Sequence, residues 1–96
     1  DPYVRFRAVR ALGRPAVKSR EAIIALIEAL GDKESYVRFG AVDGLRRLGP
    51  RSSKALSAAP WAEVTDALIK AVKDKSEVVR RHAKDALEYI GTKAVK

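Results

Sequence analysis

The sequence predicts an all-α fold, an α-solenoid of antiparallel helix pairs with about five helices. One segment occurs three times, beginning at Val4, Val37 and Val79. Each copy has Arg one residue after this valine, Ala four residues after it and Leu eight residues after it. The copies start 33 residues apart (37 − 4) and then 42 residues apart (79 − 37). A unit that repeats at this period, with helical spacing inside it, is typical of stacked helical repeats.

Local signals place the helices in order. Asp1 followed by Pro2 predicts a helix start, with Asp as N-cap and Pro at the first helical position. Gly31 and the Gly49-Pro50 pair are expected stops, and a further stop is expected near Gly91. The resulting helices cover, approximately, residues 2–12, 19–30, 35–48, 60–73 and 77–91.

We call the first helix of each pair the A helix and the second the B helix. The predicted organisation is a half-unit over residues 1–18, a unit over 19–49, a loop insertion over 50–60, a unit over 61–91 and a tail over 92–96. The first half-unit is a B helix without its A helix. We therefore expect either a fragment of a longer array or an end helix that is only half covered.

Composition narrows the class of protein. The 96 residues are 47% hydrophobic, which is enough for a folded domain, and they contain no cysteine, which excludes disulfides and cysteine-ligated metals. The longest apolar run, residues 22–27, is too short to cross a bilayer, and no secretory signal is visible, so we expect a cytoplasmic protein without membrane attachment. Met, Asn and Gln are also missing while 33% of residues are charged, a composition typical of thermophiles.

The chain resembles HEAT repeats, and in particular the short HEAT-like repeats of bilin lyases and many prokaryotic proteins. The matching segments are residues 25–32 followed by Val37-Arg38, and residues 67–74 followed by Val79-Arg80. The resemblance implies a structural ladder in which an Asp in the turn between the A and B helices pairs with the Arg after Val. It assigns this role to Asp32 with Arg38 and to Asp74 with Arg80, six residues apart in each pair.

In a HEAT solenoid the B helices line the concave surface, so their outward residues are the expected partner-binding site. On a helical projection Val37, Ala41 and Leu45 point inward, and Phe39 and Arg46 point to the opposite side. Two interpretations of the phenylalanines stay open: they are exposed anchors, or they pack against one another between adjacent helices. The predicted partner-binding residues are Phe6, Arg10, Phe39, Arg46 and Arg81.

Net charge is +8, which favours polyanions as partners or simply aids solubility. A basic run followed by Trp61 is the candidate nucleic-acid site: cations with an aromatic ring can bind phosphates and stack on bases. The alternative is that Trp61 fills the groove between helices. The run consists of Arg46, Arg47, Arg51 and Lys54.

No catalytic or metal site is predicted. His82 is the only histidine, and one histidine with nearby carboxylates is a poor zinc set, so a surface histidine is the expected role. No cofactor is expected. The sequence thus predicts a non-enzymatic protein–protein interaction scaffold. Nucleic-acid binding is the alternative, a non-catalytic subunit of a lyase-like enzyme is the third possibility, and end-to-end self-association through the uncovered first helix is a further expectation.

Overall fold

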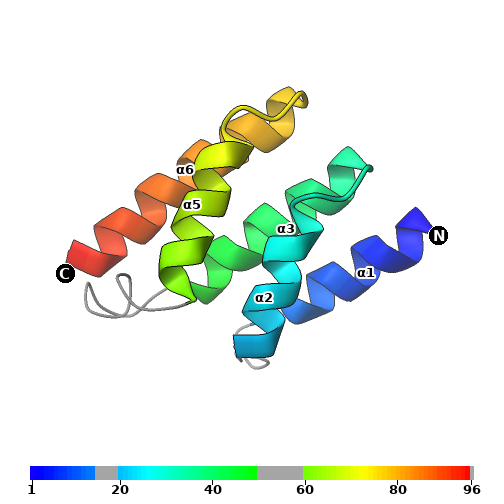
Figure 1. The fold of residues 1–96 in the computed structure, drawn as a ribbon, viewed down its shortest axis with the longest axis horizontal. Helices are drawn as coiled ribbons and strands as arrows, with labels where there is room; N and C mark the ends of the chain where they lie inside the picture. Colours follow the sequence, from blue (N-terminus) through cyan, green and yellow to red (C-terminus); the bar gives the residue numbers. More distant parts are fainter. Residues whose placement is uncertain (15–19, 50–59, 96) are drawn as a thin grey trace.

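The computed structural model describes residues 1–14, 20–49 and 60–95, and within them it contains five helices and no strand (Figure 1). The B helices run side by side in one layer, and the A helices run in the opposite direction in a second layer, with α2 on α3 and α5 on α6. This arrangement confirms the predicted all-α solenoid of antiparallel helix pairs. The B helices are α1 (Pro2–Leu12), α3 (Ser35–Leu48) and α6 (Glu77–Val95), and the A helices are α2 (Arg20–Ala29) and α5 (Trp61–Ala71).

Most helix ends follow the local signals. The carboxylate of Asp1 accepts a hydrogen bond from the Tyr3 amide at 2.8 Å, and Pro2 is the first helical residue, as predicted. At α3 the N-cap position belongs to Glu34, whose side chain makes no capping bond. Asp32 instead orders the turn before the helix, because its carboxylate accepts from the Glu34 amide at 2.9 Å. Asp74 does the same for the Ser76 amide before α6.

The last helix is longer than predicted. The sequence predicts an end near Gly91, but α6 continues to Val95. A glycine inside a helix costs only about 1 kcal/mol relative to alanine, and Lys93 and Ala94, which come after Thr92, are good helix formers, so Gly91 does not stop the helix. The predicted loop insertion over residues 50–60 and the predicted start at Ser19 lie, except for Pro60, outside the described residues.

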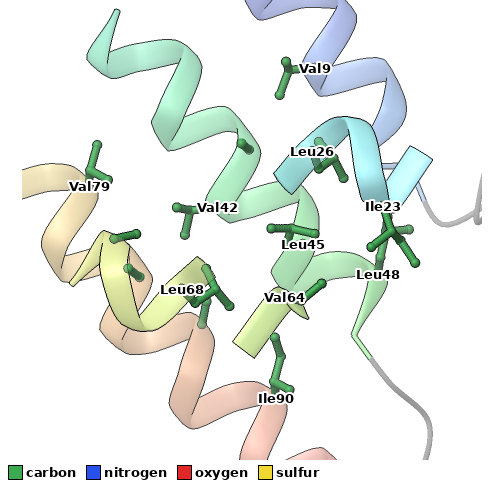
Figure 2. Close-up of a cluster of buried hydrophobic side chains, with 14 of the residues drawn as sticks. Val9, Ile23, Leu26, Val42, Leu45, Leu48, Val64, Leu68, Val79 and Ile90 are labelled. Atoms are coloured by element: carbon green, nitrogen blue, oxygen red, sulfur yellow. The ribbon is translucent and has the colours of Figure 1, made fainter. Parts of the chain in front are cut away.

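The core lies between the two layers, with α3 at its centre (Figure 2). The inward residues predicted for α3 are all buried, and Leu45 is fully inaccessible. α5 contributes Val64, Leu68 and Ala71, and Trp61 at its start is only 6% exposed. Trp61 therefore fills the space between helices, which is the structural alternative that the sequence left open.

The α1 and α3 helices cross at two glycines. A Cβ atom added to Gly13 would lie 2.7 Å from the Cα atom of Gly44, and one added to Gly44 would lie 3.2 Å from the Cα atom of Gly13. The two backbones are thus in direct contact at this point. Because only hydrogen atoms fit between them, this crossing fixes how close the first B helix comes to the second.

Candidate functional site

The B-helix face is the side of α1, α3 and α6 that the A helices leave uncovered. It holds the predicted anchors Phe6 and Phe39, and both are half-buried. Phe6 meets the edge of Tyr36 with ring centroids 5.6 Å apart, and Phe39 meets His82 at 4.7 Å, in T-shaped geometry in both cases. Each phenylalanine therefore packs on a ring of the next B helix, and the two do not pair with one another.

The residues that face the two phenylalanines differ between the two junctions. Gly40 lies beneath Phe6, and a Cβ atom on it would come within 3.3 Å of that ring. His82 occupies the corresponding position in α6 and makes the T-shaped contact with Phe39. Its Nδ1 atom lies 2.8 Å from the carbonyl oxygen of Val78. The predicted surface histidine is half-buried at the junction of α3 and α6, and it remains accessible enough to line a groove on the B-helix face.

Arginines cover several of the aromatic rings. The guanidinium of Arg10 lies 5.8 Å from the centroid of Phe6, and that of Arg46 lies 5.5 Å from the centroid of Tyr89. These are cation–π distances. Arg46 also forms an ion pair with Asp43 at 3.1 Å. The B-helix face thus carries two predicted cations that are already oriented by a neighbouring ring.

Arg81 differs from the other predicted binding residues. It takes the place in α6 that Phe6 has in α1 and Phe39 has in α3. Its side chain is 70% exposed and lies 3.7 Å from Glu77, a long contact between two exposed groups. Arg81 therefore extends the face at its C-terminal end without packing against another helix in the described part of the chain.

A small groove opens on this face between α3 and α6. It has a volume of about 340 Å³ and is lined by two acidic residues, two rings and one arginine: Asp43, Arg46, His82, Asp85 and Tyr89. Sequence reasoning missed Tyr36 and Tyr89 as parts of the face. Tyr36 directly precedes the repeated Val-Arg pair, as Tyr3 does in the first copy, and this recurrence was the signal that would have found it.

The candidate nucleic-acid residues are less available than the sequence suggested. Arg46 and Arg47 both form ion pairs with one carboxylate, Asp43, at 3.1 and 3.0 Å. Trp61 is buried and cannot stack on a base. Arg51 and Lys54 lie outside the described residues. Both described arginines of the candidate nucleic-acid site, Arg46 and Arg47, thus already have an anionic partner.

The aspartates and arginines of the predicted ladder connect neighbouring units. The carboxylate of Asp32 accepts two hydrogen bonds from Arg5, at 2.7 and 3.1 Å, and that of Asp74 accepts two from Arg38, at 2.7 and 3.0 Å. Each arginine thus binds the aspartate of the following unit in a bidentate, charge-assisted pair. The sequence analysis paired each aspartate with the arginine six residues after it, and for the carboxylate contacts these pairs are wrong.

The residues six apart are nevertheless joined, through the main chain. Nη1 of Arg38 donates to the carbonyl oxygen of Asp32 at 2.8 Å, and Nη1 of Arg80 donates to that of Asp74 at 2.7 Å. Arg38 therefore ties its own turn to the next one. Because 36 residues separate Arg38 from Asp74, no local spacing rule reveals this contact.

These contacts shift the acidity of the two aspartates. Hydrogen bonds from Arg5, and then from the Glu34 amide, lower the pKa of Asp32 to about 2. The hydrogen bonds from Arg38 likewise lower the pKa of Asp74, although burial opposes this effect. In both cases the folded protein favours the charged carboxylate.

Stability should therefore fall in acid. An unfolded aspartate has a pKa of about 3.9, so below that pH the unfolded chain binds more protons than the folded chain. The contribution of the two aspartates is fully present above about pH 5 and is lost as pH falls towards about 2. Denaturant unfolding between these values should give a clear decrease in the free energy of unfolding. A variant with both Asp32→Asn and Asp74→Asn should show a much flatter profile, and an unchanged slope would contradict the assignment.

Antiparallel helix pairs, a shared core between two layers and aspartate–arginine contacts from unit to unit define an α-helical solenoid repeat protein. Comparison with family models identifies the type of repeat, because the model for HEAT repeats matches residues 1–59. The chain belongs to the HEAT repeat family. Neither the comparison with curated proteins nor the comparison with solved structures gave a match. In the part of the chain that the structure describes, no helix combines the length and hydrophobicity that crossing a membrane requires.

Proposed function

We propose that this chain is a non-catalytic scaffold that binds a protein partner through its B-helix face, the surface that corresponds to the concave side of a HEAT solenoid. HEAT repeats commonly mediate protein–protein interactions, and the family match supports this class of function. The proposed contact residues are those predicted from the sequence, Phe6, Arg10, Phe39, Arg46 and Arg81. The bilin-lyase resemblance rests on the sequence pattern alone, whereas the family match covers HEAT repeats as a class.

The observation that carries the proposal is the pairing of cations with rings on this face. Arg10 over Phe6 and Arg46 over Tyr89 are held by contacts within the chain. Holding an arginine in place reduces the side-chain entropy that binding would otherwise cost. Arginine and aromatic residues also dominate the energetics of protein interfaces. The face therefore offers the partner preorganised anchors.

The test uses charge reversal on this face. We expect Arg10→Glu with Arg46→Glu to weaken partner binding by at least about 30-fold, the effect of losing about 2 kcal/mol at an interface hot spot. Phe39 stays unchanged, because its ring supports the packing of α3 on α6. The partner is first captured from an extract of the source cells with the wild-type chain, then purified and titrated by isothermal calorimetry.

The matched control is Lys70→Glu with Lys73→Glu, which makes the same change in net charge beside the A helices. Both lysines are exposed, so this variant should fold and bind like the wild type. Circular dichroism checks that both double variants stay helical. Equal affinities for the two double variants would contradict the proposal. A captured nucleic acid, with affinity that falls steeply between about 50 and 200 mM salt, would also contradict it.

A further inference from the structure

The N-terminal helix α1 presents an apolar surface whose counterparts elsewhere in the chain are buried. Val4 is 61% exposed, whereas Val37 and Val79, at the same place in the other two copies, are 0% and 1% exposed. Ala8 is exposed, whereas Ala41 and Ala83 are fully buried. The counterparts of Val4 and Ala8 are buried because α2 covers α3 and α5 covers α6.

A groove of about 610 Å³ runs along this side of α1. Its apolar floor includes Val4, Ala8 and Ala11, spaced four and then three residues apart, which is the spacing of one helix face. We call it the α1 groove. An A helix has the matching shape: in α5, Val64, Leu68 and Ala71 are buried with the same spacing.

Charge defines what kind of helix fits. α1 contains three arginines and no acidic residue, and Arg7, Arg10 and Arg14 line the groove. In the part of the chain that the structure describes, none of the three arginines that line the groove forms an ion pair. Arg7 and Arg10 instead lie over the rings of Tyr3 and Phe6. The groove is therefore apolar along its floor and positive along its edge.

The A helices of this chain show the complementary pattern. α2 carries Glu21 and Glu28 with one arginine, and α5 carries Glu63 and Asp66 with one lysine. An acidic amphipathic helix thus matches both the floor and the edge of the α1 groove. A second copy of the chain does not, because two α1 helices placed face to face would bring their arginines together.

One further donor points to the orientation of such a helix. Arg38 and Arg80 each donate Nη1 to the carbonyl oxygen of an aspartate in the turn after the A helix that covers them. Arg5 donates Nε and Nη2 to the carboxylate of Asp32. Among the described residues, no main-chain carbonyl accepts a hydrogen bond from its Nη1. A helix that ends over Arg5 would supply this acceptor. Such a helix lies antiparallel to α1, as α2 lies on α3.

At the opposite end of the stack, the described residues of α6 differ from their counterparts in α1 and α3. Arg81 of α6 stands at the position of Phe6 in α1 and Phe39 in α3. Likewise, Lys84 stands at the position of Val9 and Val42. Both residues of α6 are exposed. These charged residues do not match the apolar stripe of a docking helix. Among the described helices, α1 is therefore the better match for such a stripe.

We propose that the α1 groove binds an acidic amphipathic helix of a partner protein, antiparallel to α1, with an apolar stripe on Val4, Ala8 and Ala11 and carboxylates facing Arg7 and Arg14. This site shares Phe6 and Arg10 with the B-helix face and lies apart from the anchors Phe39 and Arg46. It would give the protein a second contact, with a helix rather than with a folded surface. The proposal does not depend on the function proposed above.

The test uses a fluorescein-labelled peptide with the sequence of residues 20–32, which is acidic and carries the required stripe. A lactam bridge on its exposed side holds it helical, because so short a helix is marginal in water. Fluorescence anisotropy with the 96-residue chain should show saturable binding below about 1 mM. A peptide with Glu21→Lys and Glu28→Lys should bind at least about 10-fold more weakly, which corresponds to the loss of about 1.4 kcal/mol.

Protein variants locate the site. Val4→Asp should weaken binding at least about 10-fold, the effect expected when a carboxylate enters an apolar contact. Val78→Asp is the matched control, because Val78 is 53% exposed at the start of α6 and lies outside the groove. This variant should bind the peptide like the wild type. Both valines are mainly exposed, so both variants should keep the helicity of the wild type.

Three results would overturn the proposal. They are the absence of binding up to about 1 mM, equal binding of the acidic and the lysine peptide, and equal effects of Val4→Asp and Val78→Asp. Sedimentation equilibrium adds a fourth: a dimer of the chain that Val4→Asp disrupts would show that a second copy, not an acidic helix, occupies the groove. A monomer that binds the acidic peptide is the result we expect.

Discussion

Replacement of Asp74 by asparagine is expected to lower the free energy of unfolding by about 3 kcal/mol, because it leaves the buried Arg38 guanidinium without its counter-charge. The side chains of Arg38 and Asp74 are only 8% and 11% exposed. Water therefore cannot replace the lost carboxylate effectively. For a domain of this size the melting temperature should fall by roughly 12–24 °C.

The same substitution at Asp32 provides the matched comparison. Its partner Arg5 is 38% exposed, so solvent screens the pair and the expected loss is clearly smaller than at Asp74. Asparagine retains an oxygen that can accept from the Glu34 or Ser76 amide, so neither variant loses its turn. Thermal and urea unfolding of the two variants give the comparison. Equal losses would mean that burial of Arg38 does not determine the strength of the contact.

The second large effect is expected from Gly13→Ala. The added methyl group would lie 2.7 Å from the Cα atom of Gly44, and a backbone atom cannot move aside as a flexible side chain can. The backbone angles of Gly13, φ −79° and ψ 5°, suit alanine, so the effect is purely one of packing. We expect α1 to move away from α3 and the free energy of unfolding to fall by about 1–3 kcal/mol.

Gly31→Ala is the control for this prediction. A Cβ atom there would have its nearest neighbour at 3.5 Å, an ordinary contact, and Gly31 does not adopt a left-handed conformation. Alanine at this position should therefore be neutral or should stabilise the fold by about 0.4–1 kcal/mol. Urea unfolding measures both variants, and amide hydrogen exchange shows whether α1 is the helix that loosens. A Gly13→Ala variant as stable as Gly31→Ala would contradict the close crossing.

The repeat pattern predicted the parts of the fold that depend on local periodicity. Val37, Ala41 and Leu45 recur at helical spacing, and the structure buries all three. The start of α1 followed from Asp1 and Pro2 for the same reason, since a cap is a local interaction. The predicted end of α6 was wrong, because a glycine ends a helix only when the residues after it do not favour helix formation.

Contacts between units could not be derived in the same way. Asp32 and Arg38 lie close in the sequence, but the carboxylate of Asp32 binds Arg5, 27 residues away. Choosing between these partners requires the distance between adjacent B helices. The same holds for the rings of Phe6 and Phe39: the sequence placed them on the outward side, and only the spacing of the helices brings them onto Tyr36 and His82.

The measurement that tests the proposed function most directly is an amide chemical-shift map of the ¹⁵N-labelled chain during titration with its purified partner. We expect the largest changes on the B-helix face, at Phe6, Arg10, Phe39, Arg46 and Arg81. The A helices α2 and α5 should change little. Changes confined to α2 and α5, with the five residues of the B-helix face unaffected, would contradict the account.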